Sequence, residues 1–137
     1  MSGVEWVVEA YGCSRSRLSP LDRTQELFAR MFAELELRQI GETQWHQFPG
    51  TSGITGVALL AESHLACHTF PEHASLCLNL FCCVPREEWP FAEALKELFG
   101  AASVEVRRLE RAYAPSPARS HDLAALAPEP ISRGDGR

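Results

Sequence analysis

A run of strictly alternating side chains, from Ser75 to Cys83, limits what this chain can fold into more than any other feature. The leucines Leu76, Leu78 and Leu80 occupy every second position of the run. Successive side chains of a β-strand point to opposite faces, so these leucines share one face. The pattern predicts a strand in a sheet that is covered by helices on the leucine side.

Two amphipathic segments are expected to supply those helices. In the first, Ser19 suits the N-cap and Pro20 the first helical position, and apolar side chains recur at helical spacing as far as Leu35. In the second, Pro90 can open a helix that Gly100 ends. Each segment has one apolar stripe, which favours packing on a sheet.

Further strands are expected at residues 4–11, 42–48, 57–63 and 103–113, because these segments are apolar or alternate in polarity. Strands and helices are therefore interspersed along the chain. This order predicts an α/β (α+β) fold, a two-layer sandwich of a mainly antiparallel sheet with helices on one face. The other face of the sheet requires a different cover, such as a second protomer.

The chain has 137 residues, 45% hydrophobic and 23% charged, which suits one globular domain with a real core. We expect the domain to cover residues 1–114. Residues 115–137 are rich in proline, serine and charge and are expected to form a flexible tail.

The composition also bears on partners and location. A formal net charge of -5 gives no attraction to nucleic-acid phosphates or anionic lipid, so we expect neither partner. No secretion signal and no apolar run of the roughly 20 residues that a membrane span needs is seen, which favours the cytoplasm. Five cysteines, an odd number, are expected to be free thiols there.

The densest chemistry lies between Ala61 and Cys83, in the segment AESHLACHTFPEHASLCLNLFCC. Its histidines and cysteines could bind zinc, or a cysteine and a histidine could form a thiol nucleophile. The spacing fits no CxxC or HExxH motif, so no metal site is expected, and it does not fix which cysteine would be the nucleophile. A third hypothesis is a self-processing site at Ser63, which follows the acidic Glu62 at the end of an apolar strand, with a histidine and a cysteine close by in the fold.

The segment LLAESHLACHTFPEH, residues 59–73, resembles the bacterial and archaeal S-adenosylmethionine decarboxylases. Their signature has an Ala-Glu-Ser-His run followed by His-Thr-aromatic-Pro-Glu. The N-terminal EAYGC, the glycine-containing TSGITG and an aromatic-bearing strand ending in Cys83 fall in the family's order. The resemblance extends over roughly residues 4–112.

The resemblance implies that the chain cleaves itself. Ser63 would attack the carbonyl carbon of Glu62, and the resulting ester would eliminate to leave a pyruvoyl group made from Ser63. The products would be a β chain of residues 1–62 and an α chain of residues 63–137. His68 stands where the family has its processing histidine, and Thr55 where relatives have an assisting serine.

The resemblance also implies the reaction, a pyruvoyl-dependent decarboxylation of S-adenosylmethionine that supplies the aminopropyl donor for spermidine synthesis. The pyruvoyl carbonyl would form a Schiff base with the substrate amine and accept the electrons released with carbon dioxide. Cys83 matches the proton donor and Glu72 the acidic substrate ligand, while Phe48 and Phe70 are candidates to face the sulfonium and the adenine ring. Family pockets lie between protomers, which implies a homodimer of processed αβ protomers.

Several positions depart from the commonest family pattern. They are Phe70 for tryptophan, Asn79 for aspartate, Cys82 for threonine, Val84 for glycine, and a one-residue insertion near Phe48. Two other functions therefore stay open. One is a pyruvoyl-dependent ornithine or arginine decarboxylase on the same scaffold, and the other is an unprocessed relative that binds a ligand or a partner without catalysis.

Plainer interpretations apply to other residues. Cys13, Cys67 and Cys77 are expected to be small buried apolar groups, and Trp45 to fill the core or an interface. His64 is either a pocket residue or a structural neighbour of the cleavage site. Because strand side chains alternate, only one of Cys82 and Cys83 is expected to reach the pocket.

Overall fold

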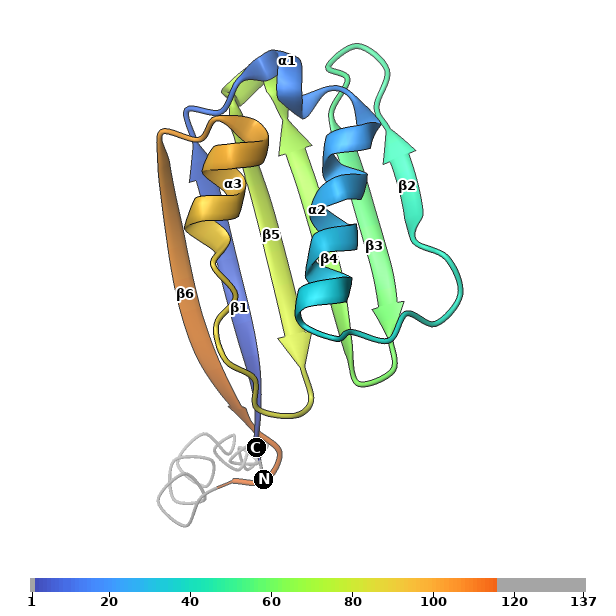
Figure 1. The fold of residues 1–137 in the computed structure, drawn as a ribbon, viewed down its shortest axis with the longest axis vertical. Helices are drawn as coiled ribbons and strands as arrows, with labels where there is room; N and C mark the ends of the chain where they lie inside the picture. The colour runs from blue at the N-terminus through green and yellow to red at the C-terminus, as the bar shows by residue number, and fades with distance from the viewer. Residues whose placement is uncertain (1, 116–137) are drawn as a thin grey trace, which may run out of the picture.

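Six strands form one sheet in the computed structural model of this protein, which describes residues 2–115 (Figure 1). The strands are β1 (Ser2–Tyr11), β2 (Gln44–Gln47), β3 (Ile54–Leu60), β4 (Ser63–Phe70), β5 (Ser75–Cys82) and β6 (Ser103–Ala112). Their order across the sheet is β2-β3-β4-β5-β1-β6, and every neighbouring pair is antiparallel.

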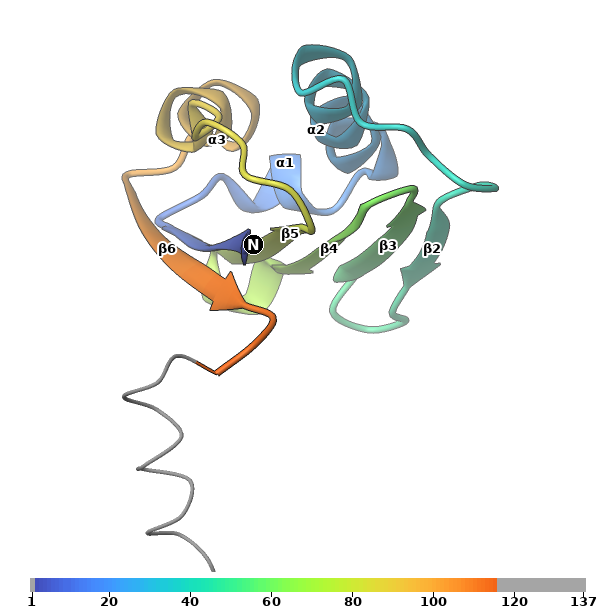
Figure 2. The ribbon, with the colours of Figure 1, turned by 90° about the horizontal axis from the view of Figure 1, so that it is seen from below.

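The helices are α1 (Arg15–Leu18), α2 (Leu21–Glu34), α3 (Phe91–Phe99) and the single 3-10 turn η1 (Pro71–His73). Figure 2 shows α2 and α3 over the same face of the sheet, while neither covers the other face, called the open face below. The predicted two-layer sandwich, a mainly antiparallel sheet with helices on one face, is confirmed.

Two boundaries differ from the sequence-based expectation. The first long helix begins at Leu21, and Pro20 is its N-cap in an extended conformation, with ψ 135. Ser19 instead ends the short α1, where its hydroxyl donates to the carbonyl of Arg15 at 3.2 Å. The predicted N-cap at Ser19 is therefore wrong by one position, because four residues before it already form a helical turn.

The expected strand at 57–63 is in fact most of β3, a turn, and the first residue of β4. The turn consists of Ala61 and Glu62, and Leu60 pairs with Ser63 across it. Neither turn residue is glycine or proline, so the sequence has no local sign of a reversal. Glu62 and Ser63 consequently lie at the tip of a hairpin.

The core lies between the sheet and the helices. Leu76, Leu78 and Leu80 are buried on the helix side, as the alternation predicts. Each leucine buried in this way stabilises the fold by about 1.5–3 kcal/mol. Trp45 packs on Phe28 of α2 with ring centroids 4.8 Å apart, which confirms its predicted place against the core.

The glycine in the middle of β3 makes that contact possible. Gly56 pairs with Trp45 of β2, and a Cβ atom at position 56 would overlap the indole ring. The glycine-containing segment TSGITG thus has a packing role in the strand itself. It allows the edge strand β2 to lay its tryptophan over the sheet.

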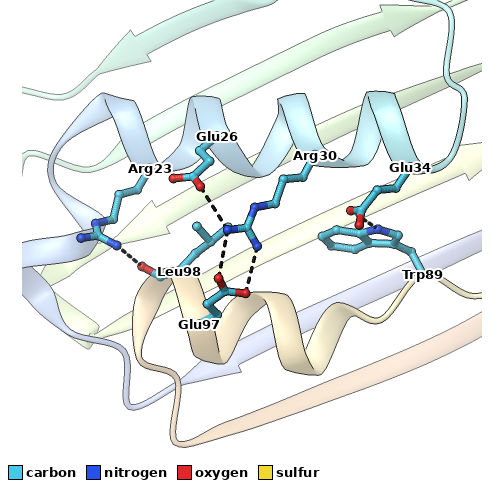
Figure 3. Close-up of polar contacts among 7 residues, drawn as sticks. All are labelled: Arg23, Glu26, Arg30, Glu34, Trp89, Glu97 and Leu98. Atoms are coloured by element: carbon cyan, nitrogen blue, oxygen red, sulfur yellow. Dashed lines mark hydrogen bonds and ion pairs between the residues drawn. The ribbon is translucent and has the colours of Figure 1, made fainter.

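Polar contacts hold α2 beside α3 (Figure 3). Arg30 of α2 donates to Glu26 at 3.1 Å and to both carboxylate oxygens of Glu97 on α3, at 3.0 and 3.1 Å. These hydrogen bonds raise the pKa of Arg30 and lower the pKa of Glu97. The Trp89 indole, just before α3, donates to Glu34 at 2.9 Å. The two helices are thereby fixed relative to each other over the sheet.

The predicted C-terminal tail, apart from Pro115, lies outside the described residues. Within residues 2–115, no helix is long and apolar enough to cross a membrane.

Candidate functional site

The Glu62–Ser63 peptide bond lies at the tip of the β3–β4 hairpin, at the lower end of the sheet in Figure 1. The carbonyl oxygen of Glu62 accepts a hydrogen bond from the backbone N–H of Cys83 at 2.7 Å. Ser63 pairs on its other side with Cys82 of β5. This peptide bond is therefore held against the end of β5, with its carbonyl already polarised by a backbone donor.

Cys82 and Cys83 differ sharply in environment, as the alternation predicts. Cys82 is fully buried on the helix side beside Ser63, whereas Cys83 is exposed just beyond the strand. Burial raises the pKa of the Cys82 thiol, although the nearby Arg86 guanidinium and the Ser63 hydroxyl act in the opposite direction. The carbonyl of Cys83 in turn accepts a hydrogen bond from the Tyr113 hydroxyl. Cys83 is thus the accessible thiol at this end of the sheet.

The other predicted pocket residues gather at the opposite end of the sheet, around a cavity of about 430 Å³. Its walls come from the β2–β3 loop, from β3, from the end of β4 and from η1. The lining residues are Phe48, Pro49, Thr51, Gly53, Thr55, His68, Thr69, Phe70 and Glu72. The structure therefore brings together every predicted substrate-binding residue and the predicted processing histidine.

Within this cavity the histidine is held in one orientation. The Thr55 hydroxyl and His68 Nδ1 share a hydrogen bond of 2.9 Å across the β3–β4 pair. The Phe70 ring lies nearly parallel to the imidazole, at 28° and with centroids 6.5 Å apart. This hydrogen bond fixes the direction of the His68 ring, and the tautomer decides which of the two groups donates.

The two groups of predicted residues do not meet within one chain. Positions 63 and 68 stand at opposite ends of β4, which separates them by about 17 Å at the usual rise of a strand. They also face opposite sides, because Ser63 shares the helix side with the buried Leu65 and His68 lies on the open face. Within a single protomer, the predicted processing histidine His68 is therefore not close to Ser63, although His64 follows Ser63 directly in β4.

A smaller cavity of about 150 Å³ adjoins His68 on the open face. Its lining includes Glu9, Cys77 and Asn79, none of which the sequence reasoning placed in a site. Glu9 accepts a hydrogen bond from Arg107 at 2.7 Å, while its other carboxylate oxygen is buried with no partner among residues 2–115. Burial, reinforced by the charge of Glu9, raises the pKa of the Cys77 thiol. Cys77 is thus half-buried and borders a cavity, whereas we expected a fully buried apolar group.

Another cavity, of about 210 Å³, adjoins the Glu62–Ser63 bond. It is lined by Glu36, Leu37, Arg38, Ala61, Glu62, Ser63 and Arg86. The two arginines are functional candidates that the sequence did not reveal, since they come from segments far apart in the chain and follow no motif.

Two observations on the described part of the chain bear on the zinc and thiol-nucleophile hypotheses. No group of three or more histidine, cysteine, aspartate or glutamate side chains within it could hold a metal ion. Cys67 is fully buried, and this burial raises the pKa of its thiol, which disfavours the reactive thiolate.

Comparison with known proteins gives a consistent result. Residues 4–112 match the family model described as S-adenosylmethionine decarboxylase. The S-adenosylmethionine decarboxylase proenzyme of Moorella thermoacetica is 34% identical over 77% of this chain and 83% of its own length. That of Geobacillus kaustophilus is 30% identical over 80% of this chain and 86% of its own length.

A solved structure supports the same fold. The adenosylmethionine decarboxylase of Aquifex aeolicus superposes with a TM-score of 0.68 at 21% identity. The match covers 84% of this chain and 94% of that one. At this identity the likeness concerns the fold.

Proposed function

The chain belongs to the S-adenosylmethionine decarboxylase family, and from that premise we propose that it cuts itself between Glu62 and Ser63 and then decarboxylates S-adenosylmethionine. The observation that carries the proposal is the hydrogen bond of 2.7 Å from the Cys83 N–H to the Glu62 carbonyl. Relatives that match most of the chain are named proenzymes, which supports a chain made in an uncut form.

In the first step the Ser63 hydroxyl loses its proton and its oxygen bonds to the carbonyl carbon of Glu62. Negative charge then develops on the carbonyl oxygen, where the Cys83 N–H is already in place to stabilise it. The C–N bond breaks, the nitrogen takes up a proton, and an ester joins the two residues. The backbone N–H of Cys83, just after β5, thus acts as a preorganised oxyanion donor.

In the second step a base removes the α-proton of residue 63, and the bond between its Cβ and the ester oxygen breaks. Glu62 leaves as a carboxylate, and residue 63 becomes a dehydroalanine. Tautomerisation and hydrolysis with one water release ammonia and leave the pyruvoyl group. Once formed, this group supplies an electron sink for the electrons that carbon dioxide leaves behind.

A homodimer accounts for the separation between the two ends of the sheet. The open face carries exposed apolar side chains, among them Val57, Leu59 and Leu109, at 45%, 59% and 47% exposure. If two such faces pack about a two-fold axis perpendicular to the strands, the hairpin tip of one protomer comes to the His68 end of the other. We propose that the partner's His68 serves each Ser63, so that neither site is complete in one chain.

The cavity beside His68 suits the substrate. Pockets for small ligands commonly measure 300–1,000 Å³ by order of magnitude, and this one is about 430 Å³. Phe48 and Phe70 remain partly exposed on its walls and offer ring faces to a sulfonium and an adenine. Glu72 on the same wall offers a carboxylate to a hydroxyl or amine of the substrate. Cys83, the exposed thiol, is the proposed proton donor to the α-carbon.

The aromatic walls favour S-adenosylmethionine over ornithine or arginine. We further propose that the product supplies the aminopropyl group for spermidine synthesis and that the protein acts in the cytoplasm.

Intact mass under denaturing conditions tests the proposal. We expect two chains divided between Glu62 and Ser63, the second with a blocked pyruvoyl end, and one uncut chain for Ser63→Ala. Carbon dioxide release should then be compared for S-adenosylmethionine, ornithine and arginine. A wild-type preparation that stays uncut would favour the non-catalytic relative, and release from ornithine or arginine alone would replace the substrate while keeping the chemistry.

A further inference from the structure

The cavity beside the Glu62–Ser63 bond contains a guanidinium that the reaction described above does not use. Arg86 follows β5 in the chain and lines this cavity together with Glu62 and Ser63. Its side chain is half-buried, and its Nη1 donates to the carbonyl of Leu35 at 2.6 Å. Leu35 is the C-cap of α2, so the guanidinium is tied to the end of a helix next to the hairpin tip.

The contacts of Arg86 leave it able to bind an anion. Besides this hydrogen bond to Leu35, its positive charge lies near the thiol of Cys82, the strand partner of Ser63, and opposes the rise in the pKa of that thiol. No ion pair among residues 2–115 includes Arg86. A guanidinium has five N–H donors in a planar fork that matches a carboxylate, so these two contacts leave donors free for one.

Self-cleavage creates a carboxylate at this place. Before the reaction the cavity is lined by two acidic side chains, Glu36 and Glu62, and two basic ones, Arg38 and Arg86. When the ester C–O bond breaks, its electron pair stays with Glu62 as a new α-carboxylate, while the α-proton of Ser63 goes to a base. The cavity edge therefore gains a third negative charge, which needs a nearby cation.

We propose that Arg86 binds the carboxylate that Glu62 gains on self-cleavage, and that it thereby stabilises the leaving group of the elimination step. The inference rests on the proposed self-processing. It assigns Arg86 to the second step, because the oxyanion of the first step already has the Cys83 N–H.

The test follows the three covalent states of the chain by intact mass during cell-free synthesis. Amide and ester have the same mass, so each sample is denatured and treated with hydroxylamine, which cuts only the ester and leaves an unmodified serine end. Pyruvoyl ends, which this treatment converts to oximes of known mass, report completed elimination. We expect Arg86→Gln to slow elimination by on the order of tenfold, so that the ester accumulates. Arg86→Lys, which keeps the charge, should recover part of that loss.

Arg23→Gln is the matched control. Arg23 also donates from Nη1 to a backbone carbonyl, that of Leu98 at 3.0 Å (Figure 3), but it does not line this cavity. Its replacement should leave the distribution of the three states unchanged. If wild type stays uncut, the proposed function fails.

Other outcomes bear on Arg86 alone. If wild type is processed and Arg86→Gln processes at the same rate, or accumulates amide in place of ester, the role of Arg86 is overturned and the proposed function stands. An Arg86→Lys variant no faster than Arg86→Gln would also overturn it.

Discussion

Replacing Cys83 with proline removes the one N–H that the structure places on the Glu62 carbonyl, at 2.7 Å. Proline has no backbone donor, so the oxygen that gains charge during the attack by Ser63 would lose its hydrogen bond. Loss of one preorganised oxyanion donor typically costs a factor of about 10²–10³ in rate. We therefore expect Cys83→Pro to form the ester at least about a hundredfold more slowly than Cys83→Ala, which keeps the N–H.

The comparison between these two variants isolates the backbone donor from the thiol, since both lack sulfur. Val84→Pro provides a control for proline itself, because residue 84 is exposed and follows the hydrogen-bonded position. The assay is the time course of chain cleavage by intact mass, with a melting curve of each uncut protein to show that it is folded. Cleavage of folded Cys83→Pro within a few-fold of Cys83→Ala would refute the reasoning.

Three further predictions concern the rest of the molecule. Thr55→Val removes the hydrogen bond to His68 and should slow self-cleavage, measured by intact mass over time, though less than His68→Ala does. Equal cleavage rates for Thr55→Val and wild type would count against a role of Thr55 in orienting His68. Burial raises the pKa of the Cys67 thiol, so as pH rises this thiol loses its proton first in the unfolded state. In denaturant titrations of the uncut Ser63→Ala protein, the free energy of unfolding should therefore hold below about pH 8.5 and decrease above it. Cys67→Ala should make that decrease smaller. Leu59→Asp places a charge on the open face and should shift sedimentation from dimer to monomer; an unchanged dimer would mean that another surface makes the contact.

Local sequence patterns predicted most of the fold, because the spacing of apolar residues within one helix or strand shows its type and its buried face. The leucines at 76, 78 and 80 identified β5 and its buried face, and the capping region at Gly100 marked the end of α3. The hairpin at Ala61 and Glu62 escaped because a turn without glycine or proline has no compositional sign. The four-residue α1 escaped because it is too short to show a periodic apolar stripe.

The candidate site could be predicted only where a resemblance named its residues. Ser63, His68 and Cys83 follow no period or metal spacing, so their roles came from the family signature. Arg86 belongs to no such signature. It lies at the hairpin because the segment after β5 contacts the end of α2, a tertiary contact that cannot be read from the local sequence.

The geometry of β4 adds a constraint on these residues that neither the sequence pattern nor the family resemblance contains. A strand of fixed rise carries Ser63 and His68 about 17 Å apart and on opposite faces, and no side-chain rotation closes that distance. If both residues act on the same peptide bond, they must come from two chains. Self-cleavage should therefore depend on protein concentration when the dimer is dilute. A mixture of Ser63→Ala and His68→Ala chains should also cleave the His68→Ala chains, although neither variant alone does so efficiently. Cleavage of His68→Ala that is no faster in the mixture than alone would place the processing base within one protomer and contradict the shared site.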